Sequence, residues 1–408
     1  MVTPSDLSSE NGAAKPNGDR AQAGSDRVAS VSAPDKARAQ AGRLREPSGG
    51  ALTVLGLETS CDETAASVVR LLPDGSAEVL SSVIHSQIED HAAYGGVVPE
   101  IAARSHVEMI DGVAARAMAE AGLGFDDLDG VGATAGPGLV GGVMVGLGFG
   151  KGVALARDLP FVAVNHLEGH AVSARLGARV DYPFLLLLVS GGHCQLLEVR
   201  GIGDMSRLGT TIDDAAGEAF DKIAKAMGLG YPGGPALERL AASGDGSRFD
   251  LPRALLGRKD CDFSFSGLKT AASRIAQTLQ TDQDRADLAD AVQNAIARQL
   301  SERSDRAMAD YAGRHEALTF VVAGGVAANK TVRRVLEETA AKRGFTFLAP
   351  PMVYCTDNAA MIALAGAERL RLGLVSDIDA PARPRWPLDE ARAIADPVHP
   401  ASRKGAKA

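Results

Sequence analysis

The chain has 408 residues, enough for two or three domains of about 150 residues each. Its 43 Lys and Arg against 51 Asp and Glu give a net charge of -8, which excludes a basic coat over the whole surface but not local basic patches. The four cysteines contain no CxxC pair, which excludes a disulfide scaffold and an all-cysteine zinc site. The 46 glycines exceed the usual share of roughly 7% and predict tight turns or close backbone approaches.

Two terminal segments have the composition of tails. Residues 1–50 contain no aromatic side chain and are rich in Ala, Ser, Gly and Pro, which predicts a disordered tail. They show neither the apolar core of a secretory signal nor the acid-poor composition of a transit peptide, so we expect a cytoplasmic protein. Residues 389–408 are predicted as a second, flexible tail.

Residues 131–150 form an uncharged stretch that meets the length rule for a membrane span. Eight of these residues are glycine and Pro137 lies among them, which favours a strand, a Gly-rich loop and the start of a helix. We therefore expect no membrane association.

Two strand-turn-strand units predict the architecture. Residues 52–57 and a second apolar stretch ending near Val69 flank the turn 58–64, and residues 184–189 and 194–199 flank a turn in the same way. Each unit opens a mixed α/β segment, so the sequence predicts two similar lobes.

The fold class that we predict is therefore α/β, with a ligand cleft between two lobes. The N-terminal lobe is expected over 51–180 and the C-terminal lobe over 181–388, with the last helix returning to the first lobe. A buried strand at 317–322, a Gly-rich turn and a helix over 330–342 belong to the second lobe.

His166 and His170 are four residues apart, so on a helix they lie about 40° apart and one turn from each other. Both imidazoles can then reach one metal, but the spacing alone leaves metal binding and ordinary helical histidines as equal alternatives. Glu168 lies roughly 200° around the helix from His166, unlike the glutamate of the HExxH peptidases. Asp357 is a candidate third ligand, although Thr356, Asp357 or Asn358 as a helix N-cap is the favoured interpretation of that cluster.

Four Gly-rich loops are candidates for contact with phosphate. None has the GK[ST] ending of a Walker A loop or a GxGxxG pattern after a strand, and each alone is typical of a structural turn. Together they favour a nucleotide held between the lobes. The loops are residues 135–142, 190–192, 231–235 and 324–325.

Residues 212–222 predict a helix with three acids, Asp214, Glu218 and Asp221, on one face. A ligand such as a ribose hydroxyl and a solvated acidic face explain this face equally well.

Seven short segments combine into a pattern that is more specific than any single motif. They are residues 56–64, 85–100, 166–170, 189–193, 213–222, 263–269 and 356–358. Together they resemble the TsaD (formerly Gcp) family over about residues 52–388, with only the two tails outside.

The resemblance implies a two-lobed ASKHA fold, shared with actin, heat-shock chaperones and sugar kinases, and the activity of a tRNA N6-adenosine threonylcarbamoyltransferase. Such an enzyme transfers threonylcarbamoyl from threonylcarbamoyl-AMP to N6 of adenosine 37 in tRNAs that read codons beginning with A, which gives t6A. The resemblance also implies a companion paralogue subunit (TsaB-like) and an ATPase subunit (TsaE-like). A metallopeptidase, an older label of the family, and an ASKHA-type small-molecule kinase are the alternatives.

Site residues follow from the same resemblance. It implies that His166, His170 and Asp357 bind one divalent metal, with iron (Fe²⁺) as the first expectation and zinc as the alternative. Asp62 and Glu63 lie at the positions of the catalytic acids. The expected substrate-binding residues are Leu188, Val189, Ser190, Gly191, Gly192, Asp221, Gly234 and Asn329.

Overall fold

The strands form two sheets in a computed structural model that describes residues 50–94 and 96–397. In the first sheet, β1, β2 and β3 form an antiparallel meander, and β4 and β5 continue the sheet parallel to β1 in the order β3-β2-β1-β4-β5. The strands are β1 (Leu52–Glu58), β2 (Glu63–Leu71), β3 (Ala77–Ser86), β4 (Gly130–Gly136) and β5 (Phe161–Asn165).

The second sheet repeats this topology, since its order is β10-β9-β6-β7-β8 with β6, β7 and β8 antiparallel and β9 and β10 parallel to β6. The two predicted strand-turn-strand units are β1–β2 and β6–β7, and the two-lobed α/β class is confirmed. The exact lobe boundaries stay a prediction. The strands are β6 (Phe184–Val189), β7 (Cys194–Gly201), β8 (Asp204–Thr210), β9 (Thr319–Ala323) and β10 (Thr346–Leu348).

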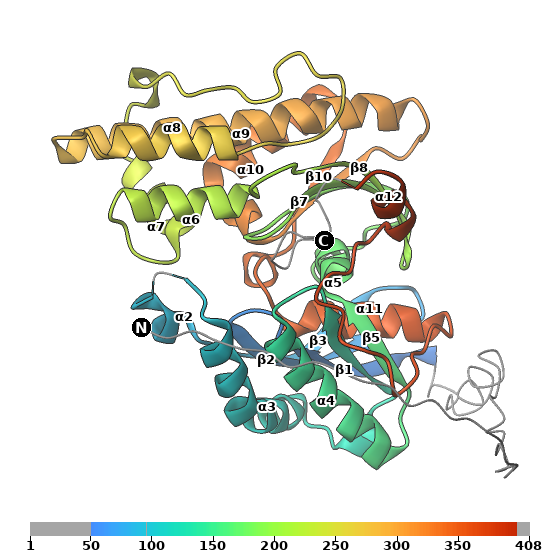
Figure 1. Cartoon of the computed structure of the whole chain (residues 1–408). Coiled ribbons are helices and arrows are strands. Elements are labelled where there is room, and N and C mark those ends of the chain that lie inside the picture. Colours follow the sequence, from blue (N-terminus) through green and yellow to red (C-terminus); the bar gives the residue numbers. More distant parts are fainter. Residues whose placement is uncertain (1–49, 95, 398–408) are drawn as a thin grey trace, which may run out of the picture.

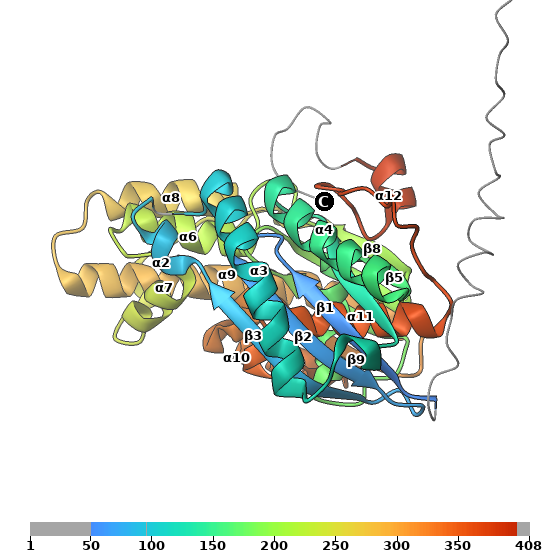
Figure 2. The ribbon, with the colours of Figure 1, turned by 90° about the horizontal axis from the view of Figure 1, so that it is seen from below.

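Helices cover both faces of the first sheet. On the outer face lie α3 (Pro99–Ala121) and α4 (Val140–Arg157), as Figure 2 shows from below. The inner face receives α11 (Ala359–Arg371) from the end of the chain, which packs on β1, β2 and β4. The backbones come so close that a Cβ on Gly56 of β1 would lie 2.3 Å from the Ala359 carbonyl oxygen. Only glycine therefore fits at this crossing.

In the second lobe, α8 (Ser266–Ala276) and α9 (Asp282–Ala312) lie on the side of the sheet away from the first lobe, whereas α6 (Ala216–Ala226) and α7 (Gly233–Ala241) lie beside it, towards the cleft (Figure 1). The long helix α9 lies over this face, and its buried side chains Ile296 and Leu300 join Leu185 and Leu187 of β6 in one core. The helices of this lobe also include α10 (Lys330–Lys342).

Helix α5 (His166–Val172) lies between the two sheets, next to α11 (Figure 1). Leu167 and Ala171 of α5 pack with Leu186 and Leu188 of β6, while α5 itself continues directly from β5. The short helix therefore joins the cores of both lobes, and whatever side chains it carries lie at their junction.

Two expectations differ from the structure. The acidic helix predicted from residue 212 begins at Ala216, because the preceding residues form hydrogen bonds outside the helix. Part of the predicted C-terminal tail is helical, since α12 spans Glu390–Ala395 and the Asp389 carboxylate accepts from the Arg207 amide at 3.0 Å. The predicted tail residues 1–49 and 398–408 lie outside the described residues.

Helix α4 is the described helix that is long and apolar enough to cross a membrane. A third of that stretch is buried, and the helix packs on β4 and α3. Its glycines allow close contact with the β1–β2 turn, since a Cβ on Gly142 would lie 2.4 Å from the Thr59 carbonyl oxygen. The fold therefore accounts for this apolar helix as part of a packed layer.

A candidate active site between the lobes

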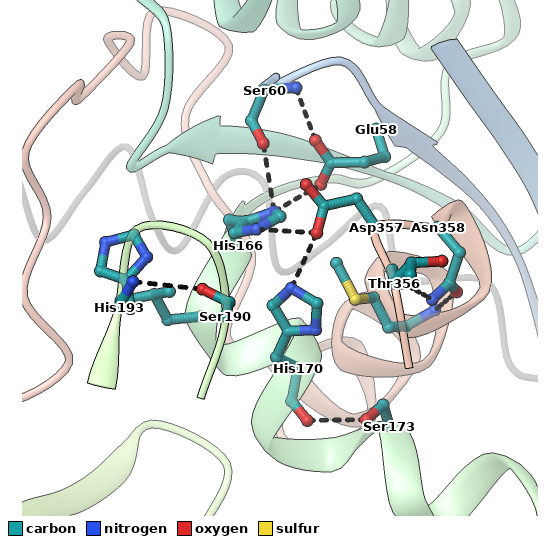
Figure 3. A network of polar contacts seen from close by, with 12 residues as sticks. Glu58, Ser60, His166, His170, Ser173, Ser190, His193, Thr356, Asp357 and Asn358 are labelled. Carbon is teal, nitrogen blue, oxygen red and sulfur yellow. Dashed lines mark hydrogen bonds and ion pairs between the residues drawn. The ribbon is translucent and has the colours of Figure 1, made fainter. Parts of the chain in front are cut away.

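The start of helix α5 places two imidazoles at the lobe junction. His166 follows β5 directly, and the Asn165 side chain caps the helix by accepting from the Leu167 amide at 2.9 Å. His170 lies one turn later, with 4.7 Å between the two ring centroids. Both side chains are buried and point to the same region (Figure 3).

Asp357 completes this group from the far end of the chain. Its Oδ1 lies 3.0 Å from His170 Nε2 and 3.5 Å from His166 Nε2. The N-cap of α11 is the neighbouring Asn358, whose side chain accepts from the Met361 amide at 3.0 Å. One asparagine therefore satisfies the cap, and the carboxylate of Asp357 remains directed at the histidines (Figure 3).

Glu58, at the end of β1, is a site residue that the sequence analysis missed. Its carboxylate is buried and accepts from His166 Nδ1 at 2.9 Å, from the Thr134 hydroxyl at 2.6 Å and from the Ser60 amide at 2.6 Å. Because Glu58 accepts from Nδ1 of His166, Nε2 is the nitrogen that faces Asp357 and that would bind a metal. A charged residue ending an apolar strand was the signal available in the sequence.

Opposite charges determine the ionisation of this cluster. Burial alone would raise the pKa of Asp357, but His166 and His170 outweigh it and hold that pKa below its usual range. Burial would lower the pKa of His166, whereas Asp357 and Glu58 raise it to about 9. Burial also acts to raise the pKa of Glu58, and His166 reverses the direction. Both carboxylates are therefore anionic at neutral pH, and the pocket favours a cation.

The residues fit a divalent metal. One ligand atom each from His166, His170 and Asp357 lies within 4.8 Å of the others. Two imidazole nitrogens and one carboxylate oxygen are a donor set for first-row transition metals, and Glu58 supplies the outer hydrogen bond that orients a metal-binding histidine. Among the described residues, no hydrogen-bond partner faces the buried Nδ1 of His170.

A cavity of about 310 Å³ opens beside this cluster, with walls from both lobes. The β1–β2 turn contributes one wall and the loops of the second lobe the other, so most of the residues predicted from the sequence meet here. The predicted residues that line the cavity are Asp62, Glu63, Ser190, Gly191, Asp221, Gly234, Asn329 and Asp357.

Three predicted substrate residues do not line this cavity. Leu188 and Val189 are strand residues of β6 whose side chains are fully buried in the cores. Gly192 lies in the exposed turn after Gly191. The Ser190 amide already donates to the His193 carbonyl at 2.8 Å, so the remaining backbone donors of this turn belong to its two glycines.

The acidic face predicted around α6 separates into two roles. Asp214 is paired with Lys269 at 2.5 Å and Lys222 at 3.4 Å. Burial acts to raise the pKa of Asp214, but Lys269 and its other partners lower it to about 2, so this acid is a structural ion-pair partner. Asp221 instead lines the cavity, its Oδ1 accepting from the Gly233 amide at 2.8 Å, and burial raises its pKa.

Glu168 points away from the metal-ligand cluster. It is buried, forms an ion pair with Arg369 at 2.5 Å and accepts from the Gly203 amide at 2.7 Å. The geometric expectation from the helix is therefore confirmed, and this glutamate is not available as the base of a peptidase.

The repeated sheets and the cavity between them define a two-lobed ASKHA protein whose cleft carries a His–His–Asp cluster with the geometry to hold a metal ion. A family model described as TsaD, tRNA N6-adenosine threonylcarbamoyltransferase, matches residues 78–364, and the chain belongs to that family. The family resemblance found in the sequence is thereby confirmed.

Relatives with the same description cover nearly the whole protein. A Caulobacter vibrioides tRNA N6-adenosine threonylcarbamoyltransferase is 72% identical over 367 residues, which are 90% of this chain and 100% of that protein. A Maricaulis maris relative is 59% identical over 364 residues, 88% of this chain and 97% of that one. T. kodakarensis HypF matches in fold, with a TM-score of 0.53 and 15% identity over 79% of this chain and 48% of that chain.

Proposed function

We propose that this protein transfers the threonylcarbamoyl group from threonylcarbamoyl-AMP to N6 of adenosine 37 in tRNA. The carrying observation is the cavity of about 310 Å³ that brings Asp62 and Glu63 of one lobe opposite Ser190, Gly191 and Asp221 of the other. Membership in a tRNA threonylcarbamoyltransferase family supports the same reaction. An exocyclic adenine amine is a poor nucleophile, so catalysis depends on the activated mixed anhydride and on its position.

The second lobe binds the adenylate in this proposal. The amide of Gly191, at the cavity wall, donates to the phosphate, and Asp221 accepts from a ribose hydroxyl. Gly234 and Asn329 line the same wall, and the Asn329 side chain also caps α10 by accepting from the Val332 amide at 2.9 Å. These contacts position the carbamoyl carbon and leave AMP as the departing group.

Glu63 is the general base in this proposal. Burial raises its pKa well above the ordinary value, and the neighbouring Asp357 and Asp62 add to that shift. A carboxyl group whose pKa rises in this way becomes a better proton acceptor for the attacking amine. Asp62, beside it in the turn, orients the amine.

One divalent metal is held by His166, His170 and Asp357, and when bound it supplies Lewis-acid polarisation of the threonylcarbamoyl group. We propose iron (Fe²⁺), because two histidines and one carboxylate are the ligand set of many non-haem Fe(II) sites, with zinc as the alternative. Elemental analysis of protein purified without added ions tests this, with His166→Ala as the variant expected to lose the metal. A His166→Ala protein with full metal content would overturn the assignment.

The proposal includes two protein partners and a cytoplasmic location, where tRNA is available. Apolar side chains exposed on the outer helices support docking of a TsaB-like paralogue: Val107 on α3, and Val140 and Met144 one turn apart on α4, are 63%, 51% and 60% exposed. A TsaE-like ATPase would act on the resulting pair. Met144→Lys is expected to weaken the paralogue complex in size-exclusion chromatography while the protein stays folded. An unchanged complex would show that the paralogue does not bind this surface.

The decisive assay combines the protein with its companion subunits, a threonylcarbamoyl-AMP synthase, tRNA, threonine, bicarbonate and ATP. Modified nucleoside is measured by mass spectrometry. If the tRNA stays unmodified while a control enzyme is active under the same conditions, the proposal is refuted. Glu63→Gln is expected to lower the rate at least about 100-fold, the usual contribution of a general base. Glu198→Gln is the control, since Glu198 is a glutamate of the second lobe that lies outside the cavity, on β7 with Arg314 and His315.

The metallopeptidase and the small-molecule kinase are less favoured functions. The peptidase would need a base beside the metal ligands, and Glu168 is engaged by Arg369 on the opposite side of α5. A kinase would give ADP from ATP and a small acceptor in the absence of tRNA, which the same assay detects.

A further inference from the structure

A chain of hydrogen-bonded side chains in the first lobe leads to the β1–β2 turn. Gln87 precedes α2 (Ile88–Ala92), His91 lies in α2 and His106 lies in α3, and all three are fully buried. Their hydrogen bonds begin at the backbone amide of Val98 and end at the carbonyl oxygen of Cys61. We call these three side chains the relay.

The hydrogen bonds of the relay all run from donor to acceptor in one direction, from Val98 to Cys61. The Val98 amide donates to His91 Nδ1 at 3.4 Å, and His91 Nε2 lies 3.3 Å from Gln87 Oε1. Gln87 Nε2 then lies 3.1 Å from His106 Nδ1, and His106 Nε2 lies 3.2 Å from the Cys61 carbonyl oxygen. A backbone amide only donates and a carbonyl only accepts, so both imidazoles are neutral and carry their proton on Nε2.

Two further observations agree with this arrangement. The Thr64 hydroxyl lies 2.8 Å from His106 Nδ1 and accepts from Gln87 Nε2 at 3.5 Å, so its own proton is free to point at that ring nitrogen. Burial lowers the pKa of His106, which favours the neutral ring that the relay requires.

One end of the relay determines the backbone around Asp62. His106 donates to the carbonyl oxygen of Cys61, and the backbone amide of Gln87, whose side chain belongs to the relay, donates to the carbonyl oxygen of Asp62 at 3.0 Å. Each carbonyl belongs to a planar peptide unit, so fixing two successive carbonyls fixes the φ and ψ of Asp62 between them. The direction in which the Cα–Cβ bond of Asp62 leaves the backbone follows from those angles, and Asp62 lines the cavity beside Glu63.

The other end lies beside a second segment of the cleft. Val98 follows Val97, which together with Gly96 lines an adjoining cavity of about 380 Å³. Asp221 and Tyr231 of the second lobe line both cavities. The relay therefore connects two first-lobe segments that face the same loops across the cleft.

We propose that Gln87, His91 and His106 are positioning residues that hold the Asp62–Glu63 turn in the orientation needed for transfer and tie it to residues 96–98. This inference rests on the proposed function, because the orientation of the turn matters for rate only if this cavity carries the reaction. A buried polar cluster that stabilised the lobe alone would change folding stability without changing the rate of the folded enzyme.

A matched pair of substitutions at His106 separates these cases. In His106→Gln the amide nitrogen reaches the former Nε2 position and still donates to Cys61, whereas His106→Asn is one carbon shorter and cannot. We expect His106→Asn to lower kcat by about 10- to 100-fold, the scale of a small misplacement of reacting groups. His106→Gln is expected to keep kcat within about threefold, and the KM for tRNA to change by less than about twofold in both variants.

The control is Ser81→Ala, which removes a buried hydrogen bond to the Val68 amide in the same lobe, away from the turn. It is expected to lower Tm without lowering kcat. Equal kcat values for the two His106 variants would overturn the proposal. If His106→Asn fails to fold, His91→Asn removes the bond to Gln87 at the far end, and a wild-type kcat there would overturn it equally.

The reconstituted assay with companion subunits, synthase and tRNA also distinguishes the two levels of inference. A wild-type protein that forms no modified nucleoside overturns the proposed function. An active wild type with an unimpaired His106→Asn variant overturns the relay alone.

Discussion

Substitution of Glu58 by glutamine is the sharpest test of how the metal-ligand cluster is oriented. The carboxylate of Glu58 receives three hydrogen bonds, from His166 Nδ1, Thr134 and the Ser60 amide, and it is 1% exposed. Glutamine has the same shape but presents one oxygen and one donor group. In one amide orientation its donor faces His166, and in the other it faces the Ser60 amide, which is also a donor.

Either orientation has a cost that can be estimated. If the amide of the new glutamine faces His166, Nδ1 must become the acceptor, the ring proton moves to Nε2, and Nε2 no longer offers a lone pair to a metal. If the amide group of the new glutamine faces Ser60, the buried backbone amide of Ser60 loses its hydrogen-bond acceptor. A buried hydrogen bond to a charged group contributes about 1.5–3 kcal/mol, which corresponds to about 10- to 150-fold in an equilibrium constant. We therefore expect Glu58→Gln to weaken metal binding by about 10- to 100-fold, the range seen for outer hydrogen bonds of metal ligands.

Competition with a chelator of known affinity measures this change, and elemental analysis confirms the metal content. Glu198→Gln is the matched control, since its buried carboxylate lies on β7 and is expected to leave metal affinity unchanged. Wild-type metal affinity in Glu58→Gln would refute the claim that this carboxylate selects the tautomer of His166.

Two further predictions concern the packing around the site. Lys269→Met should lower stability by about 1 kcal/mol at pH 7, because Asp214 loses its nearest cation while a second lysine and solvent screening moderate the loss. The pKa of Asp214 is depressed to about 2, so its contribution is present above about pH 4 and disappears as pH falls through 2; urea unfolding should show the two proteins converging at acid pH, and a constant difference would contradict the pairing. Gly142→Ala should lower stability by about 1–3 kcal/mol, because the new Cβ would lie 2.4 Å from the Thr59 carbonyl oxygen. Gly148→Ala on the same helix, where no described atom lies within 4 Å, should raise Tm slightly, and equal effects of the two alanines would contradict this packing.

Strong local patterns made much of the fold predictable. The apolar runs of β1, β2, β6 and β7 with turns between them identified both strand-turn-strand units, and α10 begins and ends where the sequence predicted, at Lys330 and Lys342. Strand β8 (Asp204–Thr210) has no comparable pattern, since polar residues interrupt it. It is a strand because the edge of β7 supplies hydrogen bonds, and that edge exists only once β6 and β7 have paired.

The site was predictable only in part because its geometry depends on distant segments. The His166–His170 pair follows from helix periodicity within five residues. Glu58 acquires its role from Thr134 and His166, which lie 76 and 108 residues further along the chain. No local pattern contains that information. The part of the relay that reaches Cys61 is also nonlocal, since α3 must pack on the first sheet before His106 meets Gln87 and Cys61.

The choice between a cap and a metal ligand at residues 357 and 358 shows where sequence reasoning reaches its limit. Aspartate and asparagine cap helices about equally well, so cap preference does not decide which of the two occupies the N-cap. The surroundings decide, because only the aspartate carries a charge that two imidazoles stabilise, as the lowered pKa of Asp357 reflects. The same division of labour occurs at α5, where Asn165 caps the helix and frees His166. In both segments an asparagine satisfies the backbone, and the ionisable neighbour is thereby available to the site.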